Sequence, residues 1–395
     1  MRNLLKAFKT EIKPSLQQKI KIEQSIGVCR FLYNSYIAKN INLYNDFKEG
    51  KIDKKNSFIN ANNFDKYINN EVKVLEDFSW INTCGSKARK KAICDAETSF
   101  KRFFKGFSGF PKFKKKKNQN VSIYFPKNNK TDWRIDRHRL NIPTLKWVRL
   151  KEFGYIPTNG IVKSGTVSKK AGRYYVSVLV EDTINDGNYT CGIGCDLGVK
   201  DTLIASNGMK FKNINKTSRV KKIERKLKKE QRKLSRKYES LKIRNKNIKK
   251  EKATRQNIQK QIAKVQKYHD RLFNIRNDYN NKIVSELVKI KPVFITIEDL
   301  AISNMMKNKH LSKAISQQKL YDLITKLISK AHQNGIEIRQ VSRWFPSSKL
   351  CNNCGNIKSD LKLSDRVYRC KCGYVCDRDL QASYNLRDCK EYKVI

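Results

Sequence analysis

Two kinds of metal-binding side chain meet near the C-terminus of the 395-residue chain. Four cysteines form two close pairs, C-x-x-C and then C-x-C: Cys351, Cys354, Cys370 and Cys372. The acidic stretch DRD, with Asp377 and Asp379, follows almost directly. Four thiolates suit a tetrahedral Zn²⁺ ion in a structural site, whereas carboxylates suit harder ions such as Mg²⁺. The sequence therefore predicts a structural zinc site placed against an acidic site.

The second cysteine pair departs from the usual pattern of a zinc ribbon. It is C-x-C where C-x-x-C is common, and Cys376 is close enough in sequence to replace Cys372 as a ligand. Both alternatives stay open on the sequence. The four histidines lie outside the cluster, and we expect none of them as a zinc ligand: His138, His269, His310 and His332. The eleven cysteines together favour reduced thiols and metal ligands over a disulfide framework.

Two further carboxylates each end an apolar stretch that we expect to be a β-strand. Asp196 closes GIGCD and Glu298 closes FITIE. A single acid at a strand end is usually a cap or turn residue, but Asp196, Glu298 and Asp379 together form a set that could hold Mg²⁺ on one sheet. Two such ions can activate water and stabilise the leaving oxygen in phosphodiester cleavage. We therefore expect these three residues to be catalytic Mg²⁺ ligands.

The chain is strongly basic. It has 86 Lys and Arg against 36 Asp and Glu, a formal net charge of +50, so nucleic acid is the expected partner. No stretch approaches the roughly 18 consecutive apolar residues of a membrane span, and no signal peptide opens the chain. We expect a cytoplasmic protein that binds nucleic acid, with no membrane association and no small-molecule cofactor.

Two basic segments are the expected contacts to phosphate. The first, GFPKFKKKK, alternates phenylalanine with lysine and ends in Lys114, Lys115, Lys116 and Lys117. Aromatic rings stack on bases and lysines meet phosphates, so this segment could hold a nucleic-acid strand; the alternative is a basic linker with core phenylalanines. The second spans residues 221–250, where fifteen Lys and Arg stand against three Asp and Glu on a predicted helix.

The hydrophobic pattern outlines the elements that must position these residues. Residues 1–13 alternate like a strand, and a helical pattern follows Pro14. Residues 121–182 are β-rich and include the hairpin TVSKKAGRYYVSVLVE. From residue 190 onward strands and helices alternate, which indicates a mixed α/β sheet, with a long helical interruption at 214–290.

The order of the motifs resembles TnpB, a family of transposon-encoded RNA-guided nucleases related to type V CRISPR effectors and to eukaryotic Fanzor proteins. That order is DLGV, IEDL, SSK-C-x₂-C-G, C-x-C-G and DRD. The stretch YRCKCGYVCDRDLQASYNL is similar to the family's closing motif, and CRFLYN and GFPKFK are similar to its N-terminal landmarks. The resemblance covers nearly the whole chain, and its specificity lies in the combination of motifs.

The resemblance implies a multidomain protein whose nuclease domain is RuvC-like, with a ribonuclease H fold. That domain would occupy residues 187–395, with a basic helical insertion at 214–290 and a zinc ribbon at 346–376. The ribbon would be inserted just before the last catalytic acid. Zinc would hold this loop compact, so that the DRD stretch is delivered to the sheet that carries the other two acids.

The same resemblance implies a function for the N-terminal half. A small β-barrel wedge domain would comprise residues 1–13 and 106–186, and a helical recognition lobe residues 14–105. In this family a guide RNA pairs with the target DNA, while the protein reads a short flanking motif and the shape of the backbone. The chain would be an RNA-guided DNA endonuclease encoded by a transposable element, with Zn²⁺ structural and Mg²⁺ catalytic.

The family pattern also chooses between neighbouring acids. It places the third ligand at the second Asp of DRD, here Asp379 and not Asp377, just before a helix start. The family usually has an Asn two residues after this Asp, and here that residue is Gln381. Glu298 fits the second ligand better than Asp299, because Glu298 closes the strand.

Two other functions could use the same fold. A nuclease-inactive relative would be an RNA-guided DNA-binding repressor, and loss of one acid would mark it; all three acids are present here. A DNA transposase or resolvase would not need the helical lobe, the wedge domain and so much basic charge to hold a long RNA. Whether the purified protein carries RNA distinguishes a transposase or resolvase from the RNA-guided functions.

Overall fold

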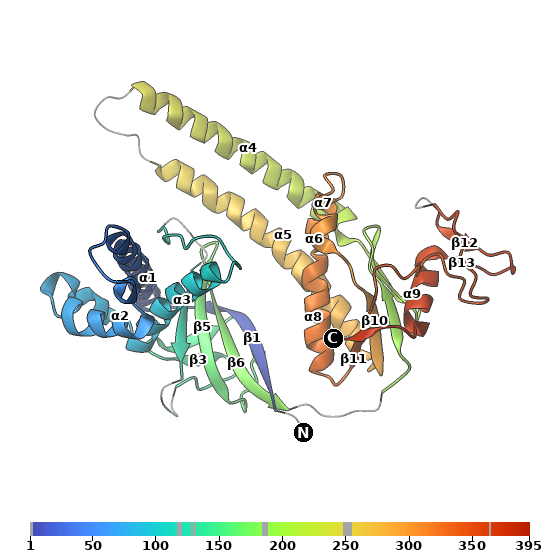
Figure 1. The fold of residues 1–395 in the computed structure, drawn as a ribbon, viewed down its shortest axis with the longest axis horizontal. Coiled ribbons are helices and arrows are strands. Elements are labelled where there is room, and N and C mark those ends of the chain that lie inside the picture. The colour runs from blue at the N-terminus through green and yellow to red at the C-terminus, as the bar shows by residue number, and fades with distance from the viewer. Residues whose placement is uncertain are drawn as a thin grey trace. The chain divides into compact units, whose positions relative to one another are not determined.

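The computed structural model describes residues 3–116, 121–127, 129, 132–183, 189–247, 255–362 and 365–395. The chain divides into two compact units, residues 3–182 and residues 183–395 (Figure 1). Each unit has its own six-stranded sheet and its own buried core. Within the described residues, no helix combines the length and the apolar character that crossing a bilayer requires.

One layer of the first unit is a sheet that includes the N-terminal strand. Its spatial order is β2 (Val121–Pro126), β5 (Val162–Lys170), β6 (Arg173–Thr183), β1 (Asn3–Lys13), β4 (Lys146–Leu150) and β3 (Arg139–Ile142). The predicted hairpin is confirmed, because β5 and β6 pair in antiparallel register next to Gly172. The φ of Gly172 is +78°, a backbone conformation that favours glycine.

The helices of the first unit share one core with this sheet. They are α1 (Leu16–Lys48), α2 (Ala61–Tyr67) and α3 (Ser86–Phe104), with shorter turns η1 (Lys54–Asn56), η2 (Ile68–Val72) and η3 (Glu76–Thr83). α1 begins at a capping box, in which the side chains of Ser15 and Gln18 each accept a hydrogen bond from the other's backbone N–H. The helical pattern predicted after Pro14 is thus confirmed.

The second unit contains the mixed sheet that the sequence predicts. Its spatial order is β14 (Lys393–Val394), β11 (Glu337–Val341), β10 (Phe294–Glu298), β7 (Ile193–Asp196), β8 (Asp201–Ala205) and β9 (Lys210–Lys212). β7, β8 and β9 are antiparallel neighbours, whereas β10 runs parallel to both β7 and β11. The carboxyl ends of β7, β10 and β11 therefore meet at one edge of the sheet.

Helices pack on both faces of this sheet. α5 (Gln256–Lys289) and α8 (Leu320–His332) share a core with one face, where Leu287 and Leu323 meet strand residues such as Ile295. α9 (Arg378–Asp388) packs against β7, β8 and β10. Between β10 and α8 the chain forms the short helices α6 (Ile302–Met305) and α7 (Ser312–Gln318).

The predicted basic insertion is a pair of long helices. α4 (Ser218–Asn247) runs beside α5 (Figure 1), after the short turn η4 (Ile214–Lys216). Their shared core includes Ile223, Leu227 and Leu234 of α4, which recur on one face of the helix.

Candidate active site and cysteine cluster

Asp196 and Glu298 end neighbouring parallel strands. β7 and β10 pair Cys195 with Ile297, so the next residue of each strand is one of the two acids. Successive side chains of a strand point to opposite faces of the sheet. Cys195 and Ile297 point into the core shared with α5 and α8. Asp196 and Glu298 therefore point to the other face, where α9 packs.

Helix α9 brings Asp379 to the same face. Gly194 of β7 is two residues before Asp196, so a side chain at either position would point to the same face of the sheet. A Cβ at Gly194 would lie 2.0 Å from the carbonyl oxygen of Ser383 in α9. The helix backbone thus lies directly on the strand. Asp379 is in the first turn of α9. The fold brings all three predicted acids to one face of one sheet.

Glu298 and Asp379 both act electrostatically on Asp196. Burial, followed by the charges of Asp379 and Glu298, raises the pKa of Asp196 to about 7, while Arg378 acts in the opposite direction. Burial, and next the charge of Asp299, raises the pKa of Glu298. Partly buried carboxylates that share a site disfavour each other's ionised form. Such an arrangement favours a bound cation, whose charge would compensate theirs.

The two neighbouring acids that the sequence offered as alternatives have other partners. Asp377 is the N-cap of α9, and its carboxylate accepts hydrogen bonds from the backbone N–H groups of Asp379, at 3.0 Å, and Leu380, at 3.2 Å. Asp299 forms an ion pair with Arg343. Both carboxylates are thus occupied by structural contacts, which favours Asp379 and Glu298 as ligands.

The close contact at Gly194 leads to a prediction about the stability of the second unit. We expect Gly194→Ala to destabilise the second unit by about 1–3 kcal/mol or more, because the added methyl group would clash with backbone atoms that cannot rotate away. Thermal melting and hydrogen exchange should show a lower melting temperature and faster exchange of the α9 amides. Cys195→Ala, one residue further along β7, removes atoms on the opposite face and should leave exchange in α9 close to wild type. Wild-type exchange in α9 of Gly194→Ala would contradict the assigned packing.

The four predicted cysteine ligands come together. All four sulfurs lie within 4.8 Å of one another, and no other set of three or more His, Cys, Asp or Glu side chains in the described part of the chain is gathered so closely. The sulfurs of Cys351 and Cys372 are 3.8 Å apart, and those of Cys354 and Cys370 are 3.6 Å apart. Tetrahedral Zn–S bonds of about 2.3 Å place sulfurs about 3.8 Å from one another. The cluster can therefore hold a metal ion.

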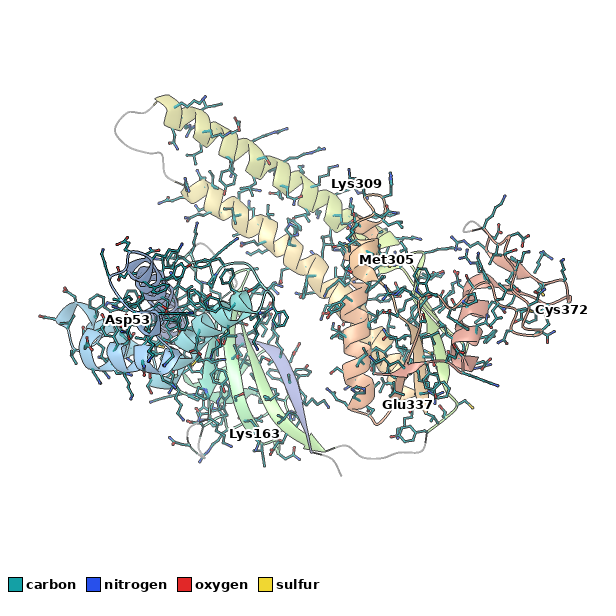
Figure 2. The ribbon with its side chains drawn as sticks, in the orientation of Figure 1. Asp53, Lys163, Met305, Lys309, Glu337 and Cys372 are labelled. Atoms are coloured by element: carbon teal, nitrogen blue, oxygen red, sulfur yellow. The ribbon has the colours of Figure 1, made fainter. Side chains whose placement is uncertain are left out.

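Cys372 belongs to this cluster and Cys376 does not. Cys376 lies in β13 (Val375–Asp377), which pairs with β12 (Val367–Arg369) in a two-stranded sheet. Figure 2 labels Cys372 beside these strands, near the C-terminal helix. A hydrogen bond from the backbone N–H of Tyr374 lowers the pKa of Cys372 to about 6, so its thiolate is favoured at neutral pH. A thiolate is the form of cysteine that binds metal.

Polar side chains of α9 hold the ribbon against the acidic site. Gln381, which is fully buried, donates a hydrogen bond of 2.5 Å from Nε2 to the carbonyl oxygen of Leu350, one residue before the first ligand. Asn385 donates to the same carbonyl at 2.7 Å. Arg378 donates from Nη1 to the carbonyl oxygen of Lys362 at 3.2 Å. The sequence motifs assign no structural role to Gln381 or Asn385, although two polar residues four apart lie on one face of a helix and could have indicated one.

A groove begins beside the acidic site. Its volume is about 490 Å³, and basic and amide side chains line much of it: Lys200, Lys216, Arg366, Asn213, Asn215 and Gln317. Arg366 joins the groove to the site, because its Nη1 lies 3.8 Å from Oδ2 of Asp379. Cations contact phosphates, and amides hydrogen-bond base edges and sugars. The groove has the chemistry to hold a nucleic-acid backbone next to the acids.

The predicted lysine segment in the first unit is partly a packing element. The ammonium group of Lys114 lies 3.7 Å from the centre of the Tyr33 ring, and burial lowers the pKa of Lys114. Lys114 still exposes much of its side chain, as do Lys115 and Lys116. Lys117 lies outside the described residues.

Three family models match the chain. A model described as "Probable transposase" matches residues 175–309, one described as "Helix-turn-helix domain" matches residues 1–49, and one described as "Cas12f1-like, TNB domain" matches residues 321–386. The last match contains β11, the four clustered cysteines and the first part of α9. Within the N-terminal match the structure has strand β1 followed by the single helix α1.

Two curated relatives align with almost the whole chain. "Putative RNA-guided DNA endonuclease" of Streptomyces pristinaespiralis is 29% identical over 98% of this chain and 89% of its own length. "Putative RNA-guided DNA endonuclease InsQ" of Escherichia coli (strain K12) is 28% identical over 97% of this chain and 91% of its own length. A chain from a cryo-EM structure of a Cas12f1–sgRNA–target DNA complex is 15% identical, with a TM-score of 0.36, over 98% of this chain and 100% of that chain.

The second unit combines a mixed α/β sheet that has acids on one face, a four-cysteine cluster that could hold a metal ion, and a groove lined by basic side chains. The family models and the relatives agree with the motif order read from the sequence. Over nearly its whole length the chain is thus similar to putative RNA-guided DNA endonucleases, in agreement with its resemblance to the TnpB family.

Proposed function

We propose that this protein is a transposon-encoded RNA-guided DNA endonuclease. The observation that carries the proposal is that Asp196, Glu298 and Asp379 lie on one face of the second sheet. There the charges of Glu298 and Asp379 contribute to the raised pKa of Asp196, after burial. The names of the two curated relatives, both given as putative RNA-guided DNA endonucleases, support the same function. The net charge of +50 supplies the attraction to guide RNA and target DNA.

The second unit fits a RuvC-like ribonuclease H fold. Support comes from the strand pattern, in which three antiparallel strands, β7 to β9, are followed by β10 and β11 running parallel to β7. We assign the nuclease domain to residues 187–395. In the first unit we assign residues 1–13 and 106–186 to a wedge domain and residues 14–105 to a recognition lobe.

The acidic site fits Mg²⁺. Its donors are carboxylate oxygens, the ligands that Mg²⁺ prefers. Burial, and next the charges of Asp379 and Glu298, raise the pKa of Asp196, and a bound cation would favour its ionised form. Mg²⁺ ions bound there would supply an activated water and stabilisation of the leaving oxygen. The chain's own residues would do the rest: the three acids hold the ions, Arg366 and the adjoining groove hold the phosphate backbone, and α9 fixes the position of Asp379.

The cysteine cluster fits structural Zn²⁺. The four sulfurs lie within 4.8 Å of one another, and they leave no position for water or substrate on a four-coordinate ion. Hydrogen bonds from Gln381 and Asn385 join the start of this ribbon to α9. We infer that zinc acts on cleavage only indirectly, because a folded ribbon keeps α9, and with it Asp379, in place.

The RNA that co-purifies with the protein tests the guide-RNA part of this proposal. We expect sequencing to find one discrete RNA species in roughly equal amount to the protein, protected from nuclease. A protein that purifies free of RNA, or with random cellular fragments only, would instead favour a transposase or resolvase that acts on DNA alone.

The exposed lysines of α4 lead to a prediction about the salt dependence of RNA binding. Lys222→Gln combined with Lys229→Gln should weaken RNA binding, and the slope of log K against log salt should fall by roughly 1.4–1.8, since each phosphate contact contributes about 0.7–0.9. Both lysines are exposed. Lys91 and Lys282, which already pair with Asp95 and Asp278 at 3.0 Å, are the matched controls. An unchanged slope in the α4 variant would show that this helix face is merely solvated.

A further inference from the structure

A groove runs along α1 in the first unit, far in sequence from the acidic site. Its volume is about 560 Å³, within the range of ligand-binding pockets. A stripe of α1 forms its floor, and Trp80 and Phe113 stand at its sides. These two aromatic side chains are 40% and 48% exposed, so much of each ring faces solvent. Large exposed aromatic surfaces at a groove are typical of binding sites.

Specific contacts hold both aromatic walls in place. The side-chain amide of Asn34 pairs with the backbone of Lys114: Oδ1 accepts from its N–H at 2.8 Å, and Nδ2 donates to its carbonyl oxygen at 3.0 Å. This pair fixes the chain immediately after Phe113. The indole Nε1 of Trp80 donates to the carbonyl oxygen of Asp77 at 3.0 Å. The groove is therefore preformed, and binding would cost little side-chain ordering.

The floor combines open space with a positive charge. Gly27 is inside a long helix, where glycine is unfavourable, yet a Cβ there would meet nothing within 4 Å. The space above it is thus part of the groove. Arg30, one helical turn further, lines the groove. Its guanidinium has no ion-pair or hydrogen-bond partner among the residues that the structure describes.

We propose that this groove binds an unpaired nucleotide of the guide RNA, with its base against Phe113 and Trp80 and its phosphate at Arg30. The inference rests on the proposed function, because it names a binding site for the RNA partner. Aromatic and guanidinium planes are the surfaces on which proteins stack unpaired bases. Lys115 and Lys116, which follow the wall residue Phe113, add the positive charge that a continuing backbone needs.

The choice of RNA over DNA follows from how each would meet the protein. The groove exists before any partner binds, so it suits the partner that the protein carries permanently. In the proposed function that partner is the guide RNA. Target-strand bases pair with the guide and are no longer available for stacking.

Two variants with opposite effects on the groove test this site. Phe113→Ala removes one wall, whereas Gly27→Leu fills the floor with a side chain that helices tolerate well. Each should weaken guide-RNA binding roughly tenfold, as expected for the loss of one stacked base. Phe107→Ala is the matched control, because Phe107, six residues before Phe113, is 72% exposed but does not line the groove.

The charge and the identity of the strand can be tested separately. Arg30→Gln should lower the salt slope of RNA binding by about 0.7–0.9, whereas Phe113→Ala should leave the slope unchanged. Ultraviolet crosslinking of the wild-type RNA complex, followed by mass spectrometry, should attach a ribonucleotide to the peptide that contains Phe113 or Trp80. Wild-type affinity in both groove variants, or crosslinks to target DNA only, would overturn this inference while leaving the guide-RNA function intact. Absence of RNA from the wild-type protein would instead overturn the proposed function.

Discussion

Asp196→Ala, Glu298→Ala and Asp379→Ala should each abolish DNA cleavage, with losses on the order of 10³-fold or more, while RNA-guided DNA binding is retained. The three carboxylates are expected to hold the same Mg²⁺ ions, so removing one should disable the site as a unit. A double variant should therefore lose little more than a single one. Binding should survive, because it is expected to use the basic helices and grooves. Cleavage assays and filter binding on the same preparations measure both properties.

The neighbouring acids are controls for this prediction. Asp377→Asn should retain most cleavage, because asparagine also caps helices and Asp377 acts as the N-cap of α9. Asp299→Asn should also retain most cleavage, because Asp299 is committed to Arg343. If either control lost cleavage as completely as Asp379→Ala, the choice of ligand would be wrong. If Asp379→Ala still cut, the acidic site would lie elsewhere.

Loss of the zinc ligands should have the second largest effect. Cys351→Ser should reduce bound zinc from about one ion per chain to nearly none, lower the melting temperature and abolish cleavage. The reason is that Cys351 is a buried member of the cluster and follows Leu350, which is hydrogen-bonded to α9. Elemental analysis, thermal melting and a cleavage assay in excess Mg²⁺ are the measurements.

Cysteines outside the cluster are the controls for zinc. Cys376→Ser should keep both zinc and cleavage, because Cys376 is not among the four gathered sulfurs. Adding Mg²⁺ back after chelation should restore cleavage only where zinc remains, since thiolates and carboxylates select different metals. A zinc-free protein that melts and cuts like the wild type would rule out a structural role for the cluster.

The elements that carry the candidate site could be predicted from the sequence because their signals are local. Strand-end acids, paired cysteines and a helix start can each be read from a few residues, and strand alternation then decides which face an acid occupies. The mixed sheet, the N-terminal strand and the basic helical pair were predicted for the same reason. The order of motifs along the chain linked these pieces.

Other features depend on contacts that the sequence does not encode locally. Leu16 and Ile20 fit the apolar pattern of α1 but are 73% and 49% exposed, whereas Ile22 is fully buried. Residues two apart on a helix lie roughly 200° apart around its axis, so Ile20 and Ile22 cannot share one face.

The contact made by Lys114 also could not be predicted from the residues next to it in sequence. The lysine run resembles a uniform phosphate-binding tract, but the ammonium group of Lys114 lies over Tyr33, a residue of α1. Only tertiary structure places that ring beneath it. The roles of Gln381 and Asn385 likewise depend on carbonyl groups more than thirty residues earlier in the chain.

The most direct test of the account is a change of guide. The protein should be purified with its RNA, and the segment of that RNA expected to pair with DNA should be replaced by a chosen sequence. The complex is then incubated with Mg²⁺ and plasmids that carry the matching target beside randomised flanking bases. We predict cleavage only of matching plasmids, only when they share one short flanking motif, and not with Asp379→Ala. Cleavage that ignores the new guide sequence, or no cleavage of any matched plasmid by the wild type, would contradict the account.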